Sequence, residues 1–277
     1  MGDIELLTSN RIDELRSLLS KDPVQNLYAL GVLEEHGTGA HTGSGPAFYG
    51  LRDDGKLTAA AMVGGNGALC VPCVFDPDAA VRLGEFLSPR IRLRGAFGER
   101  YAVDAFTRAA GQPQAKVSRP QRLFAASADD LGPFVCAQLR QAGPADLPQV
   151  VELALASAKE ANGEDLPSVP LEVFQRRVEA RLLAGRTWVL DDGPRLIMKI
   201  DLGVRSRHGA EIEGVYTIPD ARRRGVATNA LGQLCRSLLS ALPRMTIRVD
   251  DGNAAMSQVC RKVGFIAMRP QRLVTVA

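Results

Sequence analysis

The second half of the chain alternates between helical and extended patterns of apolar residues. Between 225 and 241 the apolar positions recur at helical spacing, and Pro243 ends the predicted helix. Within 245–249 every second residue is apolar, which predicts a strand with one buried face. From residue 134 onward we expect, in order, a strand at 134–142, helices at 146–158 and 171–183, a hairpin at 187–204 that turns at Asp192-Gly193, a strand at 211–219, a helix at 225–241, a strand at 244–250, a helix at 254–263, and strands at 265–268 and 272–276.

The first half carries a similar mixture of helices and strands. Asp22-Pro23 supplies a cap and a first-turn proline for a helix that runs to about Glu35. Asp54-Gly55 between two apolar runs predicts a hairpin. The other predicted elements of this half are helices at 11–20, 77–87 and 99–110 and strands at 67–74, 91–96 and 121–127. We expect a mixed α/β fold of two domains, covering residues 1–133 and 134–277.

Composition places the chain among ordinary globular proteins and narrows its partners. Of 277 residues, 45% are hydrophobic and 23% are charged, and no apolar run approaches the roughly 20 residues of a membrane span. The net charge of +3 and the 5% of aromatic residues argue against a nucleic-acid-binding surface. The N-terminus is acidic and polar, without a visible signal peptide. We therefore expect a cytoplasmic protein with neither nucleic-acid nor membrane partners.

The five cysteines and three histidines indicate no metal site. The number of cysteines is odd and their spacing is irregular, so a disulfide framework is not expected. Cys70 and Cys73 form a CxxC pair without a second pair or a suitable histidine cluster. That isolation favours two packing residues in a strand over zinc binding or redox chemistry. We expect no metal cofactor.

Residues 213–227, EGVYTIPDARRRGVA, carry the strongest chemical signal in the sequence. A strand-like run ends at Pro219, an arginine cluster and Gly225 follow, and an amphipathic helix begins there. Free backbone N–H groups and the positive end of a helix dipole both favour an anion at such a point. The stretch is not a Walker loop, since it contains no Gly-Lys-Ser/Thr. The alternative interpretation is a solvated cluster of surface arginines.

The spacing of this cluster, Arg222-x-x-Gly225-x-Ala227, resembles the pyrophosphate-binding motif of the GNAT superfamily of acyl-CoA-dependent N-acyltransferases. The order of the predicted elements from residue 134 is also the order found in that superfamily. The resemblance implies a GNAT acyl-CoA N-acyltransferase fold for residues 134–277 and acetyl-CoA as the acyl donor.

A second motif, DDGNAAMSQVCRKVGF at 250–265, is similar to the family pattern Asn-x-x-Ala…Tyr-x-x-x-Gly-Phe. The positions in place are Asn253, Gly264 and Phe265. The first half looks like the degenerate GNAT-like lobe found in two-lobed acyltransferases. After its third strand it reads VPCVFDPDAA, without the Arg-x-x-Gly motif, which implies that this lobe does not bind CoA in the usual way.

The resemblance also implies which residues hold the acyl donor. Backbone N–H groups of the arginine turn would bind the pyrophosphate, and the preceding strand would pair with the pantetheine arm. One N–H of that strand would face the thioester oxygen. The residues implied to bind CoA are Val215, Tyr216, Thr217, Arg222, Arg223, Arg224, Gly225, Val226, Ala227, Thr228, Asn253 and Ser257.

Two carboxylates and one thiol are candidates for the proton transfers. Glu211 and Glu213 precede the CoA-contacting segment, and the resemblance places Glu211 where several family members carry a base. On a regular strand both would share a face with Val215. The alternative for each is a solvated or salt-bridged carboxylate. Cys260 stands where the family usually has a Tyr acid, and its thiol could protonate the leaving thiolate or could pack in the core.

The resemblance thus implies an N-acetyltransferase that moves an acetyl group from acetyl-CoA to a primary amine by direct attack in a ternary complex. The acceptor, a small molecule or a peptide amine, would enter beside the 159–170 loop and the 187–203 hairpin. The missing Tyr keeps a second hypothesis open, a CoA-binding or sensing module without turnover. The sequence identifies neither the acceptor nor the oligomeric state.

Overall fold

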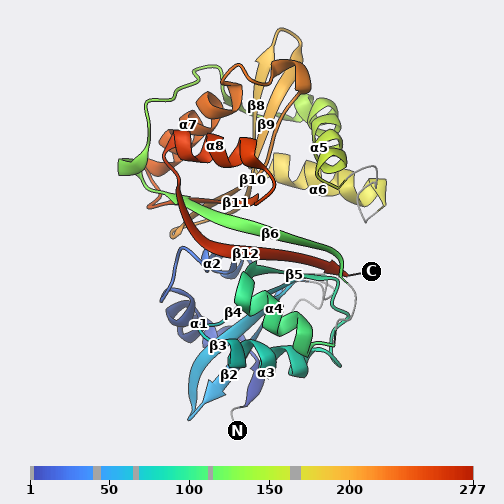
Figure 1. Cartoon of the computed structure of the whole chain (residues 1–277), viewed down its shortest axis with the longest axis vertical. Coiled ribbons are helices and arrows are strands. Elements are labelled where there is room, and N and C mark those ends of the chain that lie inside the picture. The colour runs from blue at the N-terminus through green and yellow to red at the C-terminus, as the bar shows by residue number, and fades with distance from the viewer. Residues whose placement is uncertain (1–2, 40–44, 65–68, 112–114, 163–169, 277) are drawn as a thin grey trace.

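The computed structural model describes residues 3–39, 45–64, 69–111, 115–162 and 170–276 and shows one sheet that runs through both halves of the chain (Figure 1). Its strands are β1 (Ile4–Leu6), β2 (Ala47–Asp53), β3 (Lys56–Val63), β4 (Cys70–Cys73), β5 (Gly95–Glu99), β6 (Ala115–Ala126), β7 (Arg140–Gln141), β8 (Thr187–Asp192), β9 (Arg195–Ser206), β10 (Gly209–Thr217), β11 (Met245–Asp250) and β12 (Ile266–Val276). Its α-helices are α1 (Ile12–Leu19), α2 (Leu27–His36), α3 (Pro77–Leu87), α4 (Arg100–Ala109), α5 (Leu147–Asn162), α6 (Leu171–Leu183), α7 (Val226–Leu239) and α8 (Ala254–Val263). Among the described residues, no helix is both long and apolar enough to cross a membrane.

Several elements follow local signals in the sequence. The predicted bounds of α3, α6 and α8 are confirmed, and so are both predicted hairpins, β2–β3 and β8–β9. Asp76 caps α3 by accepting a hydrogen bond from the Ala79 N–H at 2.8 Å. Asn253 caps α8 by accepting from the Met256 N–H at 2.9 Å. These short-range hydrogen bonds explain why the helix starts could be predicted from the sequence.

The predicted strand at 134–142 was wrong except for the two residues of β7. The stretch before β7 packs on α7 instead of joining the sheet. Phe134 lies so close to Gly232 that a Cβ there would come within 2.7 Å of the Phe134 Cβ. The Cys136 N–H donates to the Gln233 side chain at 3.3 Å.

Two further boundaries also differ from the prediction. The helix expected at 22–35 begins only at Leu27, although the Asp22 side chain accepts from the Gln25 N–H at 3.1 Å in a preceding turn, as a cap would. The two strands expected at the end of the chain form one strand, β12, with an irregularity between Ala267 and Pro270. The predicted loop at 159–170 overlaps α5, and its residues 163–169 lie outside the described part of the chain.

β6 and β12 cross between the two halves of the chain: β6 of the first half pairs with β11, and β12 of the second half pairs with β5 (Figure 1). The order of the described strands is β1-β2-β3-β4-β5-β12-β6-β11-β10-β9-β8-β7. Phe124 of β6 packs in the core beneath α7, and Val274 of β12 packs in the core of α3 and α4. Each half therefore completes the core of the other. Along the sequence, the domain boundary expected between residues 133 and 134 lies after β6 and before β12. That boundary stays a prediction.

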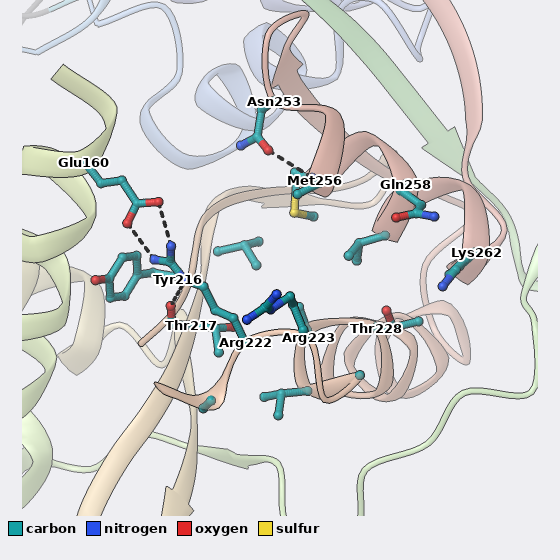
Figure 2. A pocket seen from close by; sticks show the side chains of 17 residues that line it. Glu160, Tyr216, Thr217, Arg222, Arg223, Thr228, Asn253, Met256, Gln258 and Lys262 are labelled. Carbon is teal, nitrogen blue, oxygen red and sulfur yellow. Dashed lines mark hydrogen bonds and ion pairs between the residues drawn. The ribbon is translucent and has the colours of Figure 1, made fainter. Parts of the chain in front are cut away.

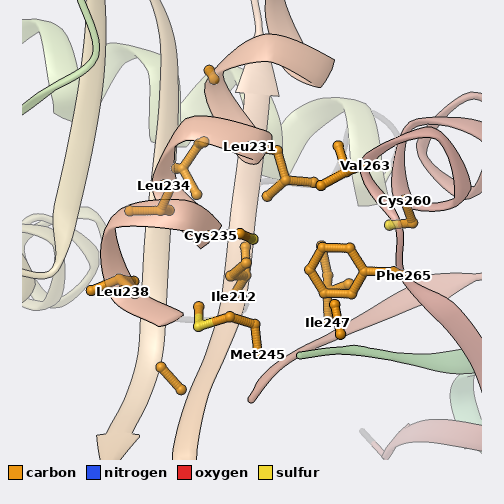
Figure 3. Packing of buried hydrophobic residues seen from close by; sticks show 14 of the residues in the cluster. Ile212, Leu231, Leu234, Cys235, Leu238, Met245, Ile247, Cys260, Val263 and Phe265 are labelled. Atoms are coloured by element: carbon orange, nitrogen blue, oxygen red, sulfur yellow. The ribbon is translucent and has the colours of Figure 1, made fainter. Parts of the chain in front are cut away.

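β9, β10 and β11 form a part of the sheet with one apolar face and one charged face. Ile212 and Ile247 point toward α7 and α8 and pack in their core (Figure 3). The opposite face carries the buried side chains of Lys199, Asp201 and Glu211. α5 and α2 pack against β9 and β10.

β10 and β11 are neighbours over a short distance. Their parallel pairing joins Ala210–Ile212 to Met245–Ile247. Past this point β10 shows a register shift against β9 between Glu213 and Tyr216, and Gly214 has a φ of +55°. β10 and β11 therefore separate, and the sheet opens at the place where the candidate site lies.

A fragment of residues 134–277 would lack β6, so β11 and β12 would lose the strand between them. We expect this fragment to aggregate, or to melt roughly 10 °C below a fragment of residues 115–277, which keeps β6. Circular dichroism melts and size-exclusion chromatography of the two fragments make the comparison. Equal melting temperatures and monomeric behaviour in both would show that β6 is not needed.

Candidate active site

A cleft of about 390 Å³ opens between the end of β10 and the N-terminal ends of α7 and α8 (Figure 2). Most of the residues implied by the sequence to bind CoA line this cleft. They are Val215, Tyr216, Thr217, Arg222, Arg223, Gly225, Val226, Ala227, Thr228 and Asn253. Two others, Arg224 and Ser257, do not line it.

The N-terminus of α7 forms one end of the cleft. Its N-cap residue is Gly225, which has a φ of +78° and therefore adopts the left-handed conformation that glycine favours. No side chain caps the helix here. The first N–H groups of a helix have no intrahelical acceptor, so those of Val226, Ala227 and Thr228 are available to an anion. The geometry fits a phosphate group at this point.

Arg222 and Arg223 take different roles at the cleft. The Arg222 guanidinium forms two bonds to the Glu160 carboxylate, at 3.0 and 2.6 Å, and its Nε donates to the Thr217 carbonyl at 2.9 Å (Figure 2). The hydrogen bonds to Glu160 raise the pKa of Arg222 above its usual range. Arg222 thus braces β10 against α5, while Arg223 and Lys262 bring positive charge to the cleft wall.

Sequence reasoning did not identify Glu160, Met256, Val259 or Lys262 as site residues. The period of α8 could have indicated Met256 and Val259, because residues three apart share a helix face with Asn253. No local signal could have found Glu160, whose partner lies 62 positions further along the chain.

Cys260 does not reach the cleft. The structure places its thiol in the apolar core beside Val263 and Phe265 (Figure 3), with 0% of the residue exposed. Burial raises the pKa of the Cys260 thiol to about 12. Of the three residues expected on one helix face, Asn253, Ser257 and Cys260, only Asn253 lines the cleft. The geometry favours the packing interpretation of Cys260 over that of an acid.

A second cavity, of about 740 Å³, lies where β10 and β11 separate. It shares wall residues with the cleft, among them Val215, Tyr216 and Met256. Charged side chains from three strands reach it: Glu213 of β10, Arg248 and Asp250 of β11, and Arg119 of β6. The cleft and the second cavity therefore meet at β10.

Glu211 and Glu213 lie in different surroundings, although they are two residues apart. The Glu211 carboxylate is buried, accepts a hydrogen bond from Arg248, and lines neither cavity. Burial raises the pKa of Glu211, and the neighbouring Arg248 opposes that rise. Glu213 is 37% exposed, lines the second cavity, and pairs with Arg181 at 2.6 Å. The irregularities in β10 on either side of Glu213 separate the two carboxylates.

The model of the family described as "Acetyltransferase (GNAT) family" matches residues 151–265, which include β10, α7 and α8. Residues 151–265 belong to the GNAT acetyltransferase family. The matched region holds both motifs singled out in the sequence, so the predicted family is confirmed.

Solved structures of GNAT proteins share the fold along nearly the whole chain. An acetyltransferase from Colwellia psychrerythraea has a TM-score of 0.62 at 11% identity, over 99% of this chain and 100% of that chain. A GCN5-related N-acetyltransferase from Sphaerobacter thermophilus has a TM-score of 0.63 at 15% identity, over 99% of this chain and 94% of that chain. A tandem GNAT protein from the clavulanic acid biosynthesis pathway has a TM-score of 0.61 at 14% identity, over 100% of this chain and 98% of that chain. At these identities the likeness shows the fold, and it confirms the predicted arrangement of two GNAT-like lobes. A search of curated proteins found no match.

The burial of Cys260 leads to a prediction of thiol reactivity. All five cysteines lie in described residues, and Cys136 is the one that is not buried. We expect iodoacetamide at about pH 8 to alkylate Cys136 and to spare Cys260, because a buried thiol of raised pKa forms little thiolate. Peptide mass spectrometry of the native protein measures this, with the denatured protein as the control. Rapid alkylation of Cys260 in the folded protein would restore it as a candidate acid.

Proposed function

We propose that this GNAT protein is an N-acetyltransferase that transfers the acetyl group of acetyl-CoA to a primary amine within a ternary complex. The observation that carries the proposal is the shared wall of the two cavities, formed by Val215, Tyr216, Asn253 and Met256 among others. A donor in the cleft and an acceptor in the second cavity would meet at β10. Direct attack of the amine on the thioester then needs no covalent intermediate on the protein.

The donor side of the proposal rests on the shape and charge of the cleft. The N–H groups at the start of α7 would hold the pyrophosphate, and Arg223 and Lys262 would add positive charge. Met256 and Val259 would give the pantetheine arm an apolar wall. β10 would offer its backbone to the same arm and, at its bulge, an N–H to the thioester oxygen.

On the acceptor side, we assign Glu213 as the carboxylate that accepts a proton. A primary amine with a pKa near ~10.4 must lose a proton before it attacks. Glu213 lines the second cavity, and its ion pair with Arg181 fixes the carboxylate there. The leaving thiolate, with a thiol pKa near ~8.5, is stable enough to depart without help from Cys260.

Acetyl-CoA should stabilise the wild-type protein, and Gly225→Glu should abolish that effect. A ligand at a hundred times its Kd stabilises the folded state by about 2.7 kcal/mol. The glutamate would place a negative charge and a side chain where the backbone of α7 meets the pyrophosphate. Thermal shift and calorimetry with acetyl-CoA measure both effects.

Ser237→Glu is the matched control for Gly225→Glu. It adds the same charge at an exposed position of α7, away from the cleft. We expect it to bind acetyl-CoA as the wild type does. Equal affinities of the wild type and Gly225→Glu for acetyl-CoA would show that the start of α7 does not bind the pyrophosphate.

Glu213→Gln should lower kcat by roughly 10²–10⁴ at neutral pH, the usual span for loss of a general base. The deficit should shrink as pH rises, because more of the amine is then already deprotonated. Glu211→Gln should instead mainly lower stability, since it leaves the buried Arg248 without its charged partner. Steady-state rates against pH and denaturant melts of both variants test this. A larger kcat loss in Glu211→Gln than in Glu213→Gln would reverse the assignment.

A CoA-binding module without turnover is the second candidate function. The observation behind it is the burial of Cys260 at the position where the family usually carries a Tyr. A screen of amino acids, polyamines and peptides with acetyl-CoA, read by release of free thiol, separates the two functions. Tight CoA binding without amine-dependent thiol release across that screen would favour the module.

A further inference from the structure

Lys199 and Asp201 form a buried ion pair on the charged face of the sheet. Their side chains are 3% and 5% exposed, and the Lys199 Nζ lies 2.5 Å from the Asp201 Oδ2. Asp201 also accepts hydrogen bonds from the Thr187 hydroxyl at 2.9 Å and from Arg181 at 3.4 Å. Stability alone does not account for such a pair, because replacing a buried ion pair by apolar residues is often neutral or stabilising.

The ion pair contacts the backbone of β10 at its bulge. The Lys199 Nζ donates a second hydrogen bond, at 3.0 Å, to the Gly214 carbonyl. Gly214 has a φ of +55°, a conformation that favours glycine. A Cβ on Gly214 would come within 2.5 Å of the Asp201 Oδ2 and 2.8 Å of the Lys199 Nζ. Gly214 therefore rests directly on the ion pair.

The hydrogen bond to Lys199 also determines the direction of the next N–H group. The peptide between Gly214 and Val215 is trans, so its carbonyl and its N–H point in opposite directions. The carbonyl faces Lys199 on the charged side of the sheet. The Val215 N–H therefore points away from Lys199, and Val215 lines both cavities.

We propose that Lys199 and Asp201 are positioning residues, which hold the Gly214–Val215 peptide so that the Val215 N–H is aimed at the thioester carbonyl of the bound acyl donor. The inference rests on the proposed acyl transfer and assigns how that site polarises its thioester. A donor that is already oriented stabilises the developing oxyanion without reorganisation during the reaction.

The same ion pair reaches the proposed base. Arg181 donates to Asp201 with one nitrogen and pairs with Glu213 at 2.6 Å through another. Gly203 leaves the space that Glu213 occupies, since a Cβ there would come within 2.7 Å of the Glu213 Oε2. One cluster of charges, buried at Lys199 and Asp201 and partly exposed at Arg181 and Glu213, therefore contacts both the peptide of the N–H donor and the carboxylate.

Lys199→Met tests the proposal, since it keeps a long side chain and removes the donor to Gly214. The probe is acetyl-CoA labelled with ¹³C at the thioester carbonyl, whose stretching frequency is followed by difference infrared spectroscopy. We expect the bound carbonyl to absorb at a higher frequency in Lys199→Met than in the wild type. We also expect kcat to fall by roughly 10²–10³, as for loss of one oxyanion donor, with CoA affinity unchanged.

Thr187→Val is the matched control, because it removes a buried hydrogen bond to Asp201 and leaves the bond from Lys199 to Gly214. It should lower the melting temperature while the carbonyl frequency and kcat stay at wild-type values. If Lys199→Met does not fold, Gly214→Ala provides a second route, because its methyl group displaces the peptide from the ion pair.

The outcomes separate this inference from the proposed function. In the wild type we expect the carbonyl of bound acetyl-CoA to absorb at a lower frequency than that of free acetyl-CoA. Loss of this shift in Lys199→Met supports the inference, even if no amine in the screen accepts an acetyl group. A wild type without any shift overturns it. A Lys199→Met protein that keeps both the shift and kcat overturns it while the proposed N-acetyltransferase stands.

Discussion

The separation of β10 from β11 after Ile212 is the constraint on which the candidate site depends. Backbone polar groups need partners, and a strand that leaves its neighbour offers those groups to side chains or to a ligand. In this protein Lys199 binds the Gly214 carbonyl, and the next two residues, Val215 and Tyr216, border both cavities. The cleft, the second cavity and their shared wall all follow from this separation.

The first half of the chain supports this open part of the sheet, although it carries no CoA motif of its own. β6 lies beside β11, and its Arg119 lines the second cavity. Phe97 of β5 lies 4.9 Å from the Arg248 guanidinium, which pairs with Glu211. Gly31 of α2 packs so closely on β9 that a Cβ would come within 2.6 Å of the Val204 Cβ. The two lobes thus share a sheet and the surroundings of the site.

The buried charges on the charged face of the sheet fall into two groups, which differ in how they relate to the cavities. Glu211 is buried and bound by Arg248, out of reach of either cavity. Lys199 and Asp201 are equally buried, but they hold the bulge that borders both. In a regular strand the alternation of side chains would have made Glu211 and Glu213 equivalent. The bulge removes that equivalence, and only Glu213 reaches the second cavity.

The sequence by itself determined most of the elements and the turn at Gly225, because their signals lie within a few residues of one another. Asp76 and Asn253 cap helices through bonds to residues three positions away. Gly225 permits the left-handed turn that starts α7. Tertiary structure alone decided the exchange of β6 and β12, the pairing of Arg222 with Glu160 and the inward direction of Cys260. Those features join distant segments, as Gln121 and Asp250 do across 129 positions, and no local pattern specifies such contacts.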